Sequence, residues 1–196
     1  MSAQSVCGAV VSRISLIMRG FFREDDRPEW RPKAFEKTLR AWCYRNSSWG
    51  YSLVGFLMVL FNRRLASVDP GLWWSPLGVA LFFQGGLSYM ADVVSFAKKS
   101  RWQTADMGLA TMLMLIVGPV LMYRMLRGRF QCPGHWNSTW SIGVVGAMFS
   151  KYKTARESRK LEPRCDVIIF WHTCWHALPF LGSVLVADMA ARAGYA

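Results

Sequence analysis

Long apolar runs are the feature that most constrains the fold of this chain. A helix needs roughly 20 apolar residues to cross the hydrocarbon core of a bilayer. Three runs reach that length, at residues 72–97, 104–123 and 167–187. A soluble domain of 196 residues has little interior in which to bury several such runs, whereas a bilayer accepts them. The sequence therefore predicts an all-α integral membrane protein.

Composition and charge agree with a membrane location. Hydrophobic residues make up 53% of the chain and charged residues 18%, which is more apolar than an ordinary soluble domain. The net charge of +12 would suit a nucleic-acid partner. The basic residues, however, lie between the apolar runs, as in cytoplasmic loops of membrane proteins. We therefore expect a membrane lipid as partner and no nucleic acid.

Two shorter apolar segments, residues 47–61 and 137–150, decide the number of spans. If both cross the bilayer, 18 of the 24 Lys and Arg residues fall on one side and 6 on the other. Without the first segment the split is 15 to 9. Because cytoplasmic loops carry the excess of Lys and Arg, the charges favour about five transmembrane helices with a cytoplasmic N-terminus.

The chain divides into two parts by this pattern. Residues 1–46 form a polar, amphipathic N-terminal segment, which we interpret as an interfacial helix or an irregular lead-in, with a short helix near 33–44. A targeting peptide is an open alternative for the first residues. Residues 47–190 form the helical transmembrane domain. Five scattered cysteines without CxxC spacing indicate neither a disulfide framework nor a zinc finger.

Few ionisable residues lie within the predicted spans, and such residues usually face the bundle interior. They are Asp92, Asp106, His172 and His176. In the expected orientation, Asp92 and His172 lie roughly 8 Å below the cytoplasmic boundary, and Ser88 and His176 lie one turn deeper. Asp106 is near the start of its span. Topology and spacing thus bring polar groups from three helices to one layer in the inner leaflet.

The spacing in this layer suits a metal site. His172 and His176 stand four residues apart, so they share one helical face, and Ser88 and Asp92 have the same spacing. Asp92, His172 and His176 with one open position would make a catalytic Zn²⁺ site, which lowers the pKa of a bound water. Asp106 is the candidate base or acid for that water. Ser88 would orient the water or donate to a developing oxyanion.

Each residue also has a simpler interpretation. The two histidines would bind neighbours by hydrogen bonds only, Asp106 would be an acid at a helix start, and Ser88 a small packing residue. The layer would then be a structural or pH-sensitive network, because histidine titrates near neutral pH. In that case the chain is a non-enzymatic membrane protein, such as a receptor-like, transport or lipid-remodelling component.

The pattern Ser88-x-x-x-Asp92, Asp106 and His172-x-x-Trp175-His176 resembles the CREST superfamily. That group includes alkaline ceramidases, adiponectin-receptor-like proteins and Per1-like proteins, and the last motif is most similar to the ceramidases. The resemblance implies a zinc-dependent hydrolase of a lipid amide or ester bond.

Two features depart from the family. Asp92 stands where the family has a zinc-binding histidine, and we count five spans where the family has seven. A carboxylate also binds zinc. Loss of two helices between the third and the last preserves the direction of the last helix, so the layer can still assemble.

Overall fold

The computed structural model describes residues 36–96, 100–117, 120, 123–124 and 134–193. Within these ranges the regular elements are all helices and no strand occurs, which confirms the all-α class. The predicted interfacial segment at the N-terminus lies outside the described residues up to residue 35. The short helix expected near 33–44 is found at 39–47 instead.

The described helices follow one another along the chain, with two short π-helical turns, η2 and η3, among them. They are α3 (Leu39–Ser47), α4 (Trp49–Leu60), α5 (Asn62–Val68), α6 (Trp74–Tyr89), η2 (Met90–Val94), α7 (Arg101–Met112), η3 (Leu113–Val117), α9 (Gly134–Ser158), α10 (Cys165–Trp175) and α11 (Ala177–Ala193).

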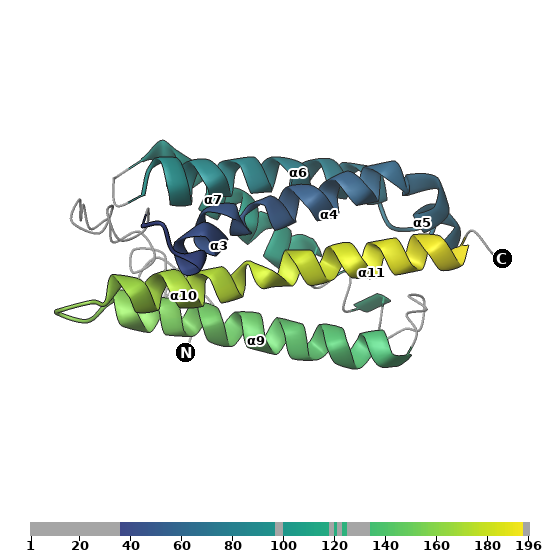
Figure 1. The fold of residues 1–196 in the computed structure, drawn as a ribbon. Coiled ribbons are helices and arrows are strands. Elements are labelled where there is room, and N and C mark those ends of the chain that lie inside the picture. The colour runs from purple at the N-terminus through teal and green to yellow at the C-terminus, as the bar shows by residue number, and fades with distance from the viewer. Residues whose placement is uncertain (1–35, 97–99, 118–119, 121–122, 125–133, 194–196) are drawn as a thin grey trace, which may run out of the picture.

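The helices pack as an elongated bundle (Figure 1). Helix α4 packs against both α6 and α11, and α7 covers α6. Helices α10 and α11 follow each other along one line, and α9 runs beside them in the opposite direction. The short α3 packs against α10, so that the end of α6, the start of α4 and α10 meet at one end of the bundle.

Among the described residues, two helical segments are long and apolar enough to cross a membrane by length and composition. They are Trp74–Val94, which joins α6 to η2, and Cys165–Ala193, which joins α10 to α11. Helix α4 is apolar but has only 12 residues, or roughly 18 Å, so it does not reach across the hydrocarbon core without its neighbours. The predicted segment 137–150 lies within α9, a single helix of 25 residues.

Large apolar side chains on the outer surface agree with a lipid environment. Ile142, Val145 and Met148 on α9 are exposed at a spacing of three residues, so they form one outward stripe. Leu115 and Ile116 in η3 are exposed in the same way. Contiguous apolar surface of this kind marks a membrane or protein interface.

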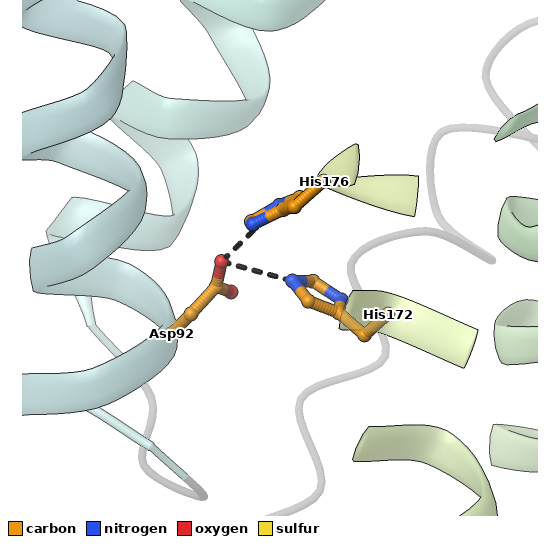
Figure 2. A group of neighbouring side chains, drawn as sticks. All are labelled: Asp92, His172 and His176. Atoms are coloured by element: carbon orange, nitrogen blue, oxygen red, sulfur yellow. Dashed lines mark hydrogen bonds and ion pairs between the residues drawn. The ribbon is translucent and has the colours of Figure 1, made fainter. Parts of the chain in front are cut away.

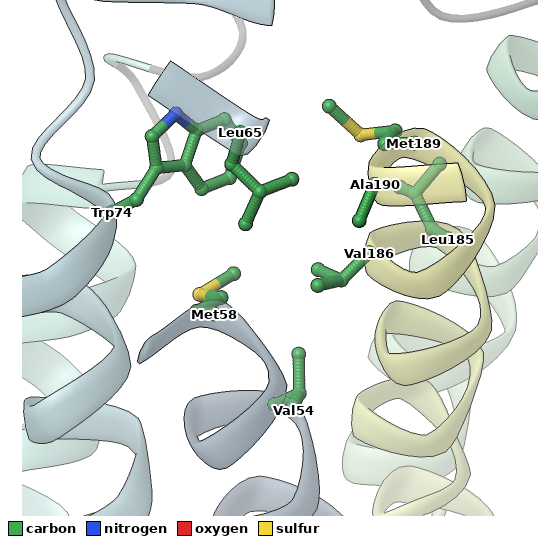
Figure 3. Close-up of a cluster of buried hydrophobic side chains, with 8 residues drawn as sticks. All are labelled: Val54, Met58, Leu65, Trp74, Leu185, Val186, Met189 and Ala190. Carbon is green, nitrogen blue, oxygen red and sulfur yellow. The ribbon is translucent and has the colours of Figure 1, made fainter. Parts of the chain in front are cut away.

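A hydrophobic core joins the helices at the end of the bundle away from α3 (Figures 1 and 3). Side chains from α4, α5 and the start of α6 face those of α11 across it. The core consists of Val54, Met58, Leu65, Trp74, Leu185, Val186, Met189 and Ala190. Burial of these side chains holds α11 against α4 and so sets the direction of the preceding helix α10.

Glycines let α4 and α6 approach closely. A Cβ atom on Gly78 would lie 2.7 Å from the carbonyl oxygen of Gly55, and one on Gly85 would lie 2.7 Å from the backbone nitrogen of Ser52. Small residues are typical of helix contacts in membranes for this reason. The close contact fixes the position of α6, and with it Ser88 and Asp92, relative to α3 and α4.

Candidate metal centre

Asp92, His172 and His176 converge at the α3 end of the bundle (Figure 2). One ligand atom from each lies within 4.8 Å of the others. The Oδ2 atom of Asp92 is 3.0 Å from Nε2 of His172 and 3.8 Å from Nε2 of His176. Asp92 extends from η2, while the histidines come from α10 and the residue that ends it. The structure thus brings the three predicted ligands together.

Asp92 lies in a π-helical turn that its sequence pattern does not reveal. The amide of Ser95 donates to the carbonyl of Met90 at 2.9 Å, which closes a ring one residue wider than in an α-helix. The hydroxyl of Tyr44 donates to the backbone carbonyl of Asp92 at 2.8 Å. Such turns are frequent at functional sites. Here, α3 holds the backbone of the widened turn, and the carboxylate is directed at the histidines.

His176 occupies the junction between α10 and α11. Its amide donates to the carbonyl of His172 at 3.2 Å, and α10 ends at Trp175. Pro179 has no amide hydrogen and leaves the carbonyl of Trp175 without its usual helical partner. The predicted span 167–187 is therefore two helices that meet at His176, rather than one uninterrupted helix.

A hydrogen-bond relay assigns the proton on His176. The hydroxyl of Ser47 donates to the carbonyl of Tyr44 at 2.8 Å. Its oxygen lies 3.0 Å from Nδ1 of His176 and, because its hydrogen is already used, accepts from Nδ1–H. Nε2 of His176 then carries the lone pair, on the side of Asp92. Metal-binding histidines are usually held in this way, with the other ring nitrogen donating to a neighbour.

Aromatic side chains enclose the two imidazoles. Tyr44 stands edge-on to His172, with ring centroids 5.6 Å apart, and Tyr51 stands edge-on to His176 at 5.5 Å. The two imidazole rings lie 4.4 Å apart. Sequence reasoning missed Tyr44, Ser47 and Tyr51. The available signal was their spacing of three and four residues, which places them on one helical face.

Ser88 contacts the carboxylate rather than an open space. It is buried, and its hydroxyl donates to Oδ2 of Asp92 at 3.0 Å. The i, i+4 spacing on α6 and η2 brings the two side chains together, as predicted. Because the hydroxyl hydrogen is engaged, Ser88 positions the Asp92 carboxylate.

Asp106 is held by a residue that sequence reasoning missed. The side-chain amide of Gln84 donates to Oδ1 of Asp106 at 2.6 Å. Helix α7 begins at Arg101, so Asp106 is in its second turn and the interpretation as a helix-start acid does not apply. Gln84, Ser88 and Asp92 repeat every four residues, a spacing that could have identified Gln84.

The donor set fits zinc in kind and arrangement. Two imidazole nitrogens and one carboxylate oxygen are ligands that Zn²⁺ accepts, and catalytic sites commonly have three protein ligands. The residues next to them, Ser47 and Ser88, fix one imidazole and the carboxylate. Chemically, these three ligand residues can hold a divalent ion, and Asp106 is not among them.

No family model, no curated protein and no solved structure matches this chain. The resemblance to the CREST superfamily therefore stays a prediction that depends on five positions, and the geometry of those positions carries the functional argument.

Proposed function

We propose that this chain is an integral membrane protein of about five spans that hydrolyses an amide or ester bond of a membrane lipid with a bound Zn²⁺. The observation that carries the proposal is the convergence of Asp92, His172 and His176, whose ligand atoms lie within 4.8 Å of one another. The relay from Ser47, which turns the lone pair of His176 toward this point, supports it.

The proposed membrane placement puts the cluster in the inner leaflet, with the N-terminus in the cytoplasm. The bundle end that holds the cluster also carries the basic turn between α9 and α10, as cytoplasmic ends do. Helix α4 would complete its span together with α3 and α5, which flank it directly. A lipid that enters from the inner leaflet would then present its polar linkage near the cluster.

The residues have distinct roles in this proposal. Asp92, His172 and His176 would hold the zinc, which when bound supplies a Lewis acid and lowers the pKa of water. Asp106 would accept the proton from the attacking water, with its carboxylate oriented by Gln84. Ser88 would keep Oδ2 of Asp92 directed at the histidines. Tyr44 and Tyr51 would shield the imidazoles from bulk water.

A non-enzymatic network is the second candidate, and one observation favours it. The Asp92 carboxylate already has hydrogen-bond partners in His172 and Ser88. The layer is therefore a connected polar network that could hold α6 against α10 without any ion. A membrane protein that responds to protonation of these histidines would need the same contacts.

Metal content separates the two candidates. Purified protein should contain about one zinc per chain, as one site of this kind implies, and His172→Ala and His176→Ala should each lose it. His135→Ala, which removes the third histidine of the sequence, is the control and should keep its zinc. Folded wild-type protein that binds no divalent metal would overturn the proposal.

Activity is the next measurement. Lipid amides and esters in mixed micelles should be hydrolysed by the zinc-loaded protein, and a chelator should abolish the reaction. Asp106→Asn should lose turnover while it keeps its zinc, because Asp106 is proposed to move a proton rather than to hold the ion. An activity or assembly state that ignores chelators and follows histidine protonation would instead support the second candidate.

A further inference from the structure

A basic groove lies between the end of α9 and the start of α10, where the chain turns between the two helices. Its volume is about 270 Å³. The groove is lined by Lys153, Arg156, Glu157, Lys160, Val167 and Trp171. Trp171 precedes His172 by one residue, a step of roughly 100° around the helix. The groove therefore opens on a different face of α10 from the Asp–His cluster.

Among the described residues that line the groove, the one acid is Glu157, which is paired within the protein. Glu157 is buried, lies 2.5 Å from the ammonium of Lys160, and accepts a hydrogen bond from the backbone amide of Arg164 at 3.2 Å. Glu157 thus connects the end of α9 to Arg164, just before α10, and neutralises the charge of Lys160. Among the described residues, Lys153 and Arg156 have no carboxylate partner, so within this part of the chain the groove presents two unpaired cationic groups.

The aromatic wall of the groove suits the boundary between headgroups and acyl chains. The Lys153 ammonium lies 5.1 Å from the ring centroid of Phe149 and 6.0 Å from that of Trp171. These two rings meet edge to face at 5.5 Å. Tryptophan is enriched at the headgroup level, and a lysine there lays its stem along apolar surface with the ammonium in water.

We propose that this groove binds the phosphate group of an anionic phospholipid in the cytoplasmic leaflet. Lys153 and Arg156 stand three residues apart on one face of α9 and would both contact the phosphate. Six Lys and Arg residues between 151 and 166 add attraction to an anionic surface. The site depends on the membrane location of the chain, not on the metal.

Lipid titration followed by native mass spectrometry tests the proposal on the full-length protein in detergent. Phosphatidic acid should bind more tightly than phosphatidylcholine. The double variant Lys153→Gln/Arg156→Gln should bind phosphatidic acid about 30-fold more weakly, since each basic group near an anionic lipid surface contributes roughly fivefold. The matched control Arg63→Gln/Arg64→Gln removes two exposed charges at the other end of the bundle and should bind as the wild type does.

Each alternative outcome contradicts the proposal. Equal weakening in both double variants would mean general attraction to a basic protein, and equal binding of the two lipids would exclude an anionic site. Inorganic phosphate that competes at the same concentration as the lipid would point to a soluble anion instead. Both double variants should keep their zinc, so a failure in the lipid titration leaves the proposed hydrolase to be judged by its own tests.

Discussion

The Nδ1 atom of His176 lies 3.0 Å from the hydroxyl oxygen of Ser47, a residue 129 positions earlier in the chain. This contact joins α3 to the junction of α10 and α11 and assigns the ring proton of a candidate metal ligand. A hydrogen bond of this kind orients the ring and makes its other nitrogen a better ligand. The role of Ser47 is therefore open to direct measurement.

Ser47→Ala should weaken zinc binding roughly 10- to 100-fold, the usual effect of removing a partner of a metal-binding histidine. Competition with a chromophoric zinc chelator would measure the change. Ser183→Ala is the matched control, because Ser183 is also buried but donates to the carbonyl of Pro179 within its own helix. If Ser47→Ala leaves the zinc affinity unchanged, Ser47 does not support His176 as a metal ligand.

Asp92→His should retain zinc, because it replaces one accepted ligand with another and restores the residue expected from the CREST resemblance. Asp92→Asn should bind zinc more weakly, since it loses the negative charge and keeps a similar shape. Both variants would be assayed for zinc after purification. If Asp92→His folds but binds no metal while Asp92→Asn is unaffected, the carboxylate belongs to a polar network and not to a metal site.

Gly78→Ala should destabilise the protein, because the new Cβ would lie 2.7 Å from the Gly55 carbonyl and 2.9 Å from the Met58 Cβ. Two backbones would have to separate, and overpacking of this kind costs about 1–3 kcal/mol. Gly86→Ala on the same helix is the control, since its Cβ would meet no atom within 4 Å. Thermal unfolding in detergent would compare them. Equal unfolding temperatures would show that the glycine contact is not tight.

The site was predictable where two of its side chains lie on the same helix, because their spacing in the sequence then places them on one helical face. Spacing of four residues pairs His172 with His176 and Ser88 with Asp92, and a depth argument then places the pairs at one level. The structure brings these residues together. Ser47 was not predictable in the same way, because its contact joins segments that only the folded chain brings together.

The fold was predictable in its class but not in its irregularities. Hydropathy identifies apolar helices, and it also indicates that residues 47–61 are short for a span. It does not reveal the widened turn at Asp92, which depends on where a backbone amide finds its carbonyl. Hydropathy also does not reveal that the apolar segment around Pro179 is interrupted at His176, where α10 gives way to α11. Both irregularities direct ligand side chains, so they matter more than the helix boundaries.

Arg124→Ala should destabilise the end of the bundle away from the cluster. Arg124 pairs with Asp69 and donates to the carbonyl of Gly71 at 2.6 Å, and the two charged side chains are only 18% and 4% exposed. Removal of one partner leaves a buried charge, at a cost of about 3–5 kcal/mol. Chemical unfolding would measure the loss.

Two further variants control for this prediction. Arg192→Ala breaks a pair with Asp188 whose side chains are 57% and 28% exposed, so it should change stability little. Asp69→Asn added to Arg124→Ala should recover part of the loss, because it removes the unpaired charge. Similar effects for Arg124→Ala and Arg192→Ala would indicate that the Asp69 pair is solvated.

The turn between α9 and α10 should loosen as the pH falls. The hydrogen bond from Lys160, joined by that from the Arg164 amide, lowers the pKa of Glu157 from its ordinary value of 4.5. Glu157 lies beyond the predicted span 137–150. The pKa of Glu157 is lower in the folded than in the unfolded state. The Glu157 carboxylate therefore contributes its full stabilisation of the fold above the unfolded-state pKa, and this contribution is lost as the pH falls through the folded-state pKa.

Hydrogen exchange of residues 157–164, measured from neutral pH down to below the ordinary carboxyl pKa and corrected for intrinsic rates, would report this opening. In the wild type, protection from exchange should decrease as the pH is lowered. In Glu157→Gln it should be lower than in the wild type at neutral pH and independent of pH, because the neutral side chain accepts hydrogen bonds but cannot form the ion pair with Lys160. Glu162→Gln changes an exposed acid in the same turn and should behave as the wild type does. Protection that is constant across this range would mean that other contacts hold the turn. The basic groove would then keep its shape without Glu157, because Lys153 and Arg156 are both carried by α9 itself.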